Sequence, residues 1–340
     1  MSPSGMRQPG ELLIGCVAHG VTHSTASVPD LATRFEMVRD VGVFDYVDRL
    51  PPDDELEQTL QAVQRTGLPV PAGSGVYTLG RDDALYEHNL RKAREMGSVV
   101  HNVQLRQTHA DGHALSDEEV ASCWLHLLEL GHRYGVTPCF EVHVGMWSEH
   151  FGRVARVAER VKAADAPWHL TLDASHVIFK IDNPIEQAVQ DLRGEIESGD
   201  VVLEPGRPFS VMQAWIDAGW VLHAHARAAV PANPVNQWAR HPDGSFGRGI
   251  QYPFFRPGPG EYVTDDWRES RLEPWKAAMR ALLDHHAEHG QGRTLRISTE
   301  YIPGIDYGAG HRYSLFEHNV ACAYWLRDEW AQALGRQMGM

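Results

Sequence analysis

Acidic residues and histidines follow several apolar segments of this sequence at the points where those segments end. In chain order they are Glu141 and His143 in "FEVHV", Asp173 and His176 in "LTLDASHV", His223 and His225 in "LHAHAR", and Glu300 in "RISTEY". Ionised carboxylates that are buried together are costly unless something compensates their charge. A divalent metal ion compensates them directly, because each carboxylate can bond it. We therefore expect the ends of these segments to form one metal site.

The expected ligands are three carboxylates and one imidazole, namely those of Glu141, Asp173, His225 and Glu300. Only one histidine of "HAH" is expected to bind the ion directly. We prefer His225, because it is nearer the end of its segment, and place His223 behind it. A ligand set rich in carboxylates suits Mn²⁺ or Mg²⁺ better than Zn²⁺, which prefers more nitrogen and sulfur donors. We expect one Mn²⁺ ion first, with Mg²⁺, Co²⁺ and Zn²⁺ as alternatives.

Four further residues are expected to contact a substrate: His176, Arg227, His101 and Gln104. His176 lies three residues beyond Asp173 and can hydrogen-bond a bound substrate. Arg227 can bind a substrate oxygen, and a surface salt bridge is the equal alternative. Residues 101 and 104 follow a predicted strand into the expected cavity.

The remaining histidines near segment ends have less specific surroundings. His143 is either a proton carrier beside Glu141 or a core or supporting residue, and the sequence does not favour one of these. His19, His23 and His109 are expected to be ordinary polar lining or surface.

Short apolar segments alternate with amphipathic ones along most of the chain. The expected strands are 11–20, 43–50, 68–79, 98–105, 137–144, 170–177, 219–228 and 293–302. Helices are expected over 31–42, 53–67, 84–96, 116–135, 151–163 and 314–330, where apolar residues recur at helical spacing. Eight such alternations predict a (β/α)8 TIM barrel in one domain, residues 1–340, whose strand ends form the active face. An open two-layer α/β sheet is the alternative.

One connection is too long for an ordinary barrel loop. Residues 228–265, between the seventh and eighth expected strands, are rich in proline, glycine and aromatic residues. Loops of this length tend to be lids or binding loops. We expect an inserted, lid-like loop.

Composition excludes some partners. The chain has 340 residues with 31 basic and 45 acidic side chains, a net charge of −14. Nucleic acids and anionic membranes attract clustered Lys and Arg, so we expect neither as a partner. No stretch has the apolar length of a membrane span, and the N-terminus lacks the apolar region of a signal peptide. The four cysteines form no CxxC pair, and a reducing cytoplasm is the expected location.

The motifs resemble those of the xylose-isomerase-like TIM-barrel superfamily of sugar isomerases and epimerases. The resemblance covers residues 11 to 330 and rests on "FEVH", "DASH", "HAHAR" and "ISTEY", and on "GPGEY" at 258–262, which is similar to a Pro-Gly-Glu turn of many members. It implies that Glu141, Asp173, His225 and Glu300 hold one divalent metal ion. It also implies chemistry at a sugar carbonyl, with proton transfer by Glu141 and Glu300, or by His143.

The length of the chain and its aromatic insertion indicate a particular branch of this superfamily. The insertion carries Trp238, Phe246, Tyr252, Phe254 and Phe255, which suit a flat apolar group or pack the insertion onto the barrel. These features are similar to the metal-containing subunit of bacterial C-glycoside deglycosidases. That similarity implies β-elimination from a 3-oxo-C-glycoside and a smaller second subunit as partner. A ketose isomerase or epimerase working through an enediolate is the alternative.

Two other function classes compete with a sugar enzyme. The DNA-repair branch of the same fold uses three metal ions and a basic groove, and the net charge of −14 and the lack of a His-Asp pattern after His225 argue against it. A non-catalytic sugar-binding or partner-binding barrel would not need Glu300 for function.

Overall fold

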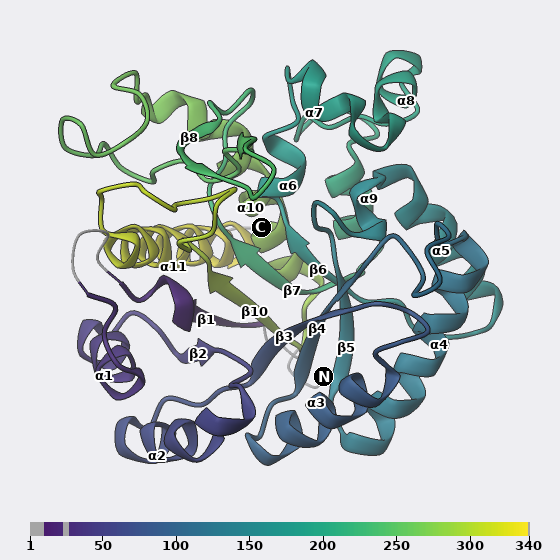
Figure 1. The fold of residues 1–340 in the computed structure, drawn as a ribbon, viewed down its shortest axis with the longest axis horizontal. Coiled ribbons are helices and arrows are strands. Elements are labelled where there is room, and N and C mark those ends of the chain that lie inside the picture. Colours follow the sequence, from purple (N-terminus) through teal and green to yellow (C-terminus); the bar gives the residue numbers. More distant parts are fainter. Residues whose placement is uncertain (1–9, 23–26, 339–340) are drawn as a thin grey trace, which may run out of the picture.

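The structure, a computed structural model, describes residues 10–22 and 27–338. Eight strands form one sheet that curls into a nearly closed barrel surrounded by helices (Figure 1). In chain order the barrel strands are β1 (Glu11–Val17), β2 (Tyr46–Asp48), β3 (Ala72–Tyr77), β4 (Val100–Leu105), β5 (Thr137–Glu141), β6 (Leu170–Asp173), β7 (Val221–Ala226) and β10 (Thr294–Thr299). Neighbouring strands pair in parallel throughout. The predicted (β/α)8 barrel is confirmed.

Helices fill the connections between the strands. They are α1 (Leu31–Val41), α2 (Leu56–Thr66), α3 (Asp83–Glu95), α4 (Asp117–Tyr134), α5 (Phe151–Ala163), α6 (Ser175–Ile178), α7 (Pro184–Ala188), α8 (Leu192–Ser198), α9 (Val211–Asp217), α10 (Glu273–His289) and α11 (Leu315–Met338). The sequence motif at α4 shows why the boundaries fall where they do. Ser116 and Glu119 form a reciprocal capping box, and Gly135 ends the helix in the left-handed conformation.

The barrel closes between β2 and β3 with few bonds. The hydrogen-bonded sheet order is β2-β1-β10-β7-β6-β5-β4-β3, which leaves these two strands at its edges. Two backbone hydrogen bonds join the edges: Val47 N–H donates to the Pro69 carbonyl at 3.0 Å, and Arg49 N–H to the Ala72 carbonyl at 3.2 Å. This sparsely bonded junction is called the seam below.

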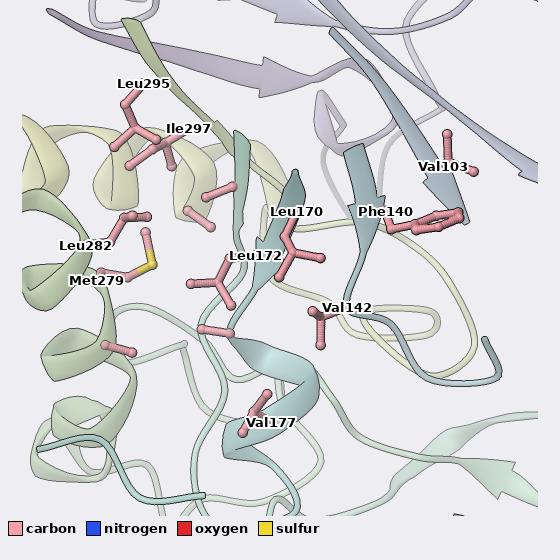
Figure 2. Packing of buried hydrophobic residues seen from close by; sticks show 14 of the residues in the cluster. Val103, Phe140, Val142, Leu170, Leu172, Val177, Met279, Leu282, Leu295 and Ile297 are labelled. Atoms are coloured by element: carbon pink, nitrogen blue, oxygen red, sulfur yellow. The ribbon is translucent and has the colours of Figure 1, made fainter. Parts of the chain in front are cut away.

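Side chains alternate between the barrel interior and the helical layer. Leu170 and Leu172 of β6 pack among the core residues shown in Figure 2, together with Met279 and Leu282 of α10. Their neighbour Thr171 points the other way and contacts His223 across the interior. The same two-residue period therefore buries the apolar side chains between the strands and the surrounding helices, and it gathers the polar side chains in the barrel interior.

The insertion lies between β7 and β10. It includes β8 (Asn236–Arg240) and β9 (Phe246–Gly247), a separate antiparallel pair. Tyr252 is buried and Phe254 packs against the core, whereas Trp238, Phe246 and Phe255 are more than a third exposed. The insertion is thus partly packed onto the barrel. No helix among the described residues is long and apolar enough to cross a membrane.

Gly15 leaves room for a buried tyrosine. A Cβ at Gly15 would lie 2.1 Å from the ring of Tyr46, the residue beside it on β2. We expect Gly15→Ala to lower the free energy of unfolding by about 1–3 kcal/mol, because it forces the ring to move. Gly194→Ala is the control, since a Cβ there, in α8, meets nothing within 4 Å. It should raise stability by about 0.5–1 kcal/mol. Urea denaturation measures both, and equal effects would contradict the packing described here.

Candidate metal centre

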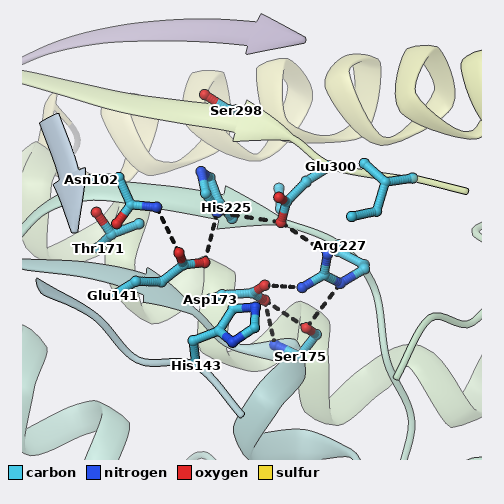
Figure 3. A network of polar contacts seen from close by, with 12 residues as sticks. Asn102, Glu141, His143, Thr171, Asp173, Ser175, His225, Arg227, Ser298 and Glu300 are labelled. Carbon is cyan, nitrogen blue, oxygen red and sulfur yellow. Dashed lines mark hydrogen bonds and ion pairs between the residues drawn. The ribbon is translucent and has the colours of Figure 1, made fainter. Parts of the chain in front are cut away.

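Four side chains from neighbouring strand ends converge inside the barrel (Figure 3). Glu141 ends β5, Asp173 ends β6, His225 is near the end of β7, and Glu300 directly follows β10. One ligand atom from each lies within 4.8 Å of those of the others. All four residues are buried, from 0% exposed for Asp173 to 9% for Glu300. The structure therefore brings together the four residues that the sequence proposed as ligands, and we call them the acidic cluster.

His225 lies among the carboxylates of this cluster. Its Nδ1 atom is 3.0 Å from Glu141 Oε1 and 3.3 Å from Glu300 Oε2. Burial alone would lower the pKa of His225, but the charges of Glu300 and Glu141 outweigh it and raise the pKa well above the usual value. The surroundings of Nδ1 thus favour positive charge at this point.

Arg227 supplies a second positive charge. Its side chain is buried, and its guanidinium pairs with Asp173 and, at 2.9 Å, with Glu300 Oε2. Burial lowers its pKa, but these two carboxylates raise it above the usual range. The sequence left open a substrate contact or a surface salt bridge for Arg227. The salt bridge exists, but it is buried inside the barrel and not on the surface.

The charges of the cluster fit a divalent cation. Three carboxylates carry three negative charges, and Arg227 compensates one of them. With a divalent ion bound and His225 neutral, the total becomes zero. Three carboxylate oxygens and one imidazole nitrogen are also a donor set that binds Mn²⁺, Mg²⁺ and Zn²⁺. The residues present therefore fit the metal ion that the sequence implies, without deciding which metal it is.

The turn after β6 fixes Asp173. Its Oδ1 accepts hydrogen bonds from the Ser175 backbone N–H at 2.9 Å and from the Ser175 hydroxyl at 2.6 Å. Its Oδ2 is 3.1 Å from His176 Nε2, and His176 also lies 3.0 Å from an Arg227 nitrogen. Burial lowers the pKa of His176 to about 3, so the ring is neutral. In this structure His176 therefore contacts both Asp173 and Arg227 directly.

The two candidates on β4 face opposite sides of the strand. Gln104 Nε2 donates to Glu141 Oε2 at 2.6 Å, and Asn102, which the sequence did not single out, does the same at 2.6 Å. His101 instead contacts the Tyr77 hydroxyl at 2.7 Å and the ring of Tyr86 on α3. Residues 101 and 104 are three apart, and side chains alternate along a strand, so they cannot share the cavity. The expectation that His101 lines the cavity therefore needs correction.

His143 and Tyr307 meet beside the acidic cluster. β5 ends at Glu141, so His143 lies in the loop beyond the strand, yet its ligand atom is still within 4.8 Å of one on Glu141. His143 Nδ1 is 2.5 Å from the Val144 carbonyl, which can only accept, so Nδ1 donates there. In the neutral ring Nε2 then accepts from the Tyr307 hydroxyl, 3.2 Å away. The Tyr307 ring also lies over the Arg227 guanidinium, at 4.0 Å from its centroid.

The insertion holds the segment that carries Tyr307. Asn236 Nδ2 donates to the carbonyls of Ile305 at 2.9 Å and Ala309 at 2.8 Å. The backbone N–H groups of Ile250 and Arg248 each donate to Asp306, both at 2.8 Å. Tyr307 therefore reaches the cluster from a loop that the insertion supports. These contacts could not be predicted from the sequence, because they join segments about 60 residues apart.

A layer of polar side chains lies next to the acidic cluster inside the barrel. It consists of Asp48, Asn102, Thr171, His223 and Ser298, which we call the polar layer; all five are buried. His223 contacts the Thr171 hydroxyl at 3.3 Å and the Ser298 hydroxyl at 3.2 Å. His223 is not among the four residues of the acidic cluster, but it, His225 and Asp48 each have a ligand atom within 4.8 Å of those of the others. Asp48 went unnoticed in the sequence because β2 is short, although it too is an acid at a strand end.

Of the three weaker candidates, two lie among the described residues, and neither belongs to the acidic cluster. His19 is exposed after β1, and His23 is outside the described residues. His109 forms a surface group with Asp111 and His113. The "GPGEY" turn is a local structure, in which the Gly258 N–H donates to Glu261 Oε2 at 2.7 Å.

Comparison of this chain with known proteins finds similar folds among solved structures. No model of a known protein family matches the sequence, and no curated protein matches it. The solved structure of the IolI protein with a bound zinc atom is 13% identical, with a TM-score of 0.52, over 94% of this chain and 99% of that one. A D-allulose 3-epimerase from Methylomonas sp. is 13% identical, with a TM-score of 0.52, over 95% of this chain and 100% of that one.

The third structure is a fusion of a xylose isomerase-like TIM barrel with 4-hydroxyphenylpyruvate dioxygenase. It is 16% identical, with a TM-score of 0.55, over 96% of this chain and 44% of that one. Together these similarities show that the chain shares its barrel fold with these three proteins.

Proposed function

We propose that this protein is a divalent-metal-dependent sugar isomerase or epimerase, which removes a proton beside a carbonyl group and returns it. The observation that carries the proposal is the acidic cluster. Its three buried carboxylates and one imidazole each place a ligand atom within 4.8 Å of those of the others. A divalent ion held there would polarise a carbonyl oxygen and stabilise the negative charge that develops on it. The ligands that would hold it are Glu141, Asp173, His225 and Glu300.

Glu141 and Glu300 suit proton transfer on two sides of a substrate. They come from β5 and β10, which are separated in the sheet by β6 and β7. One ionised carboxylate takes the proton from the carbon next to the carbonyl; the C–H electron pair forms a C=C bond and the carbonyl π pair moves onto the oxygen, which gives an enediolate. The other carboxyl group enters the step protonated and gives its proton to the opposite face of the same carbon, which restores the carbonyl and yields the epimer, so the two groups exchange protonation states. For the isomer, the proton goes to the former carbonyl carbon, and the hydroxyl proton of the first carbon passes to the former carbonyl oxygen.

Other residues of the network orient the substrate and these carboxylates. Arg227 pairs with Asp173 and Glu300 and fixes their positions, and its guanidinium is where a substrate oxygen can bind. Gln104 and Asn102 both donate to Glu141 Oε2, which turns Oε1 toward His225 and the proposed metal position. His143, held by the Tyr307 hydroxyl, stands beside Glu141 as a further proton carrier. His176 lies within reach of the same substrate.

Reprotonation is favoured over elimination. The sequence led us to prefer β-elimination from a 3-oxo-C-glycoside, with isomerisation or epimerisation as the alternative. The D-allulose 3-epimerase and the xylose isomerase-like barrel, both of similar fold, support the alternative by their names. We therefore propose a ketose as the substrate.

Loss of one carboxylate of the cluster should remove activity. We expect Glu300→Gln to slow Mn²⁺-dependent exchange of a ketose C–H proton into D₂O by about 10²-fold or more, because a proton carrier is lost. Metal content after gel filtration should fall as well. NMR of D-allulose or D-fructose measures the exchange, and inductively coupled plasma analysis measures the metal. The control is Glu317→Gln, the same change at an exposed residue of α11.

Unchanged exchange in Glu300→Gln would reject the proposed role of Glu300. Release of an aromatic aglycone from a 3-oxo-C-glucoside, without exchange on free ketoses, would instead restore the elimination reaction.

The Tyr307 hydroxyl should affect turnover through His143. We expect Tyr307→Phe to reduce kcat by about 2- to 10-fold, the range for one net hydrogen bond of about 0.5–1.5 kcal/mol. Metal affinity should stay unchanged, because Tyr307 contacts no oxygen of the acidic cluster. Tyr324→Phe, at a half-exposed tyrosine of α11, serves as the control. Steady-state kinetics with saturating Mn²⁺ tests the effect, and equal kcat in both variants would argue against a role for this bond.

A further inference from the structure

The imidazole of His225 has two nitrogens in different surroundings. Nδ1 faces Glu141 and Glu300 at 3.0 and 3.3 Å, where the metal ion of the proposed function would lie. Nε2 points away from the acidic cluster. Among the described residues, Asp48 is the one carboxylate with an ion pair to Nε2, at 3.8 Å. The ring therefore lies between the acidic cluster and a fourth carboxylate.

Asp48 is held as a buried anion. Its residue is 4% exposed, and its Oδ2 accepts a hydrogen bond from the Ser298 hydroxyl at 2.6 Å. That hydroxyl is itself 2.9 Å from the Tyr46 hydroxyl and 3.2 Å from His223 Nε2, so both of those groups can donate to it. Asp48 Oδ2 also lies 3.4 Å from His223 Nε2. The buried carboxylate is thus held in position by the Ser298 hydroxyl and faces two histidines.

A histidine binds a metal ion through a nitrogen that carries no proton. The ring then keeps its one proton on the other nitrogen, and an anion facing that nitrogen stabilises this tautomer. Carboxylates commonly take this position behind metal-bound histidines, and their removal typically weakens metal binding about 10- to 100-fold. Asp48 has the charge, the burial and the direction that the position requires.

We propose that Asp48 is the positioning residue of the metal centre: it holds the His225 proton on Nε2, so that Nδ1 is free to bind the ion. This inference rests on the proposed function, since it assumes that the acidic cluster binds a divalent metal. It adds a residue from β2. This strand is far from the four ligands in sequence, but in the sheet only β1 separates it from β10. Asp48 is not one of the four proposed ligands, and although it also lies 3.4 Å from His223 Nε2, its proposed effect on the metal centre passes through His225.

The test compares two Asp→Asn variants that change the net charge equally. Asp48→Asn removes the anion behind His225 with little change of shape. Asp53→Asn is the matched control, because Asp53 is exposed, five residues further along, and pairs with Lys92 and His88. Isothermal titration with Mn²⁺ and with Zn²⁺, starting from metal-free protein, measures Kd. We expect Asp48→Asn to raise both values about 10- to 100-fold and Asp53→Asn to leave them within about threefold.

Three results would count against the proposal in distinguishable ways. Equal Kd values for wild type and Asp48→Asn would overturn the role of Asp48 while leaving the metal centre intact. A wild-type protein that binds neither ion would overturn the proposed function itself. Circular dichroism and urea unfolding in EDTA show whether Asp48→Asn folds. If it does not, ¹⁵N NMR of histidine-labelled, Zn²⁺-loaded wild type decides, since a proton on Nδ1 of His225 would overturn the proposal and a proton on Nε2 supports it.

Discussion

Three carboxylates buried at one end of a barrel are the constraint on which this structure depends. Charges of one sign repel strongly where water is excluded, so the fold must supply positive charge at the same place. Arg227 supplies one such charge and His225 can hold another. The arrangement is tolerable without an ion and balanced with one. Stability and metal binding therefore draw on the same few side chains.

Strand periodicity explains how the sequence builds such a site. Every second residue of a barrel strand faces inward, so β6 contributes Thr171 and Asp173 to the interior while Leu172 packs outside. The parallel arrangement then brings all strand ends to one face. Acids at the ends of three strands and a histidine near the end of a fourth must meet there, whatever the loops do. The insertion and the loop with Tyr307 are added to this frame and complete its surroundings.

This geometry also explains which features the sequence revealed. The four members of the acidic cluster were predictable, because each lies at the end of an apolar strand and parallel strands align their ends. The helices α6 to α9, α10 and the contacts of Tyr307 were not, since they depend on packing between distant segments. His101 was misplaced because a strand end was read without counting its alternation from Gln104. Asp48 obeys the same strand-end rule as the ligands but ends a strand of three residues, too short to show a pattern.

At the seam, few backbone hydrogen bonds join the neighbouring strands of the barrel. Asp48 lies on β2 between Val47 and Arg49, whose backbone N–H groups make the two bonds across the seam. Local opening begins where few backbone bonds must break. A fluctuation that parts β2 from β3 would leave this carboxylate held only by β1 and by the Ser298 hydroxyl of β10. The distance between Asp48 and the ring that it faces would then vary with the opening of the barrel.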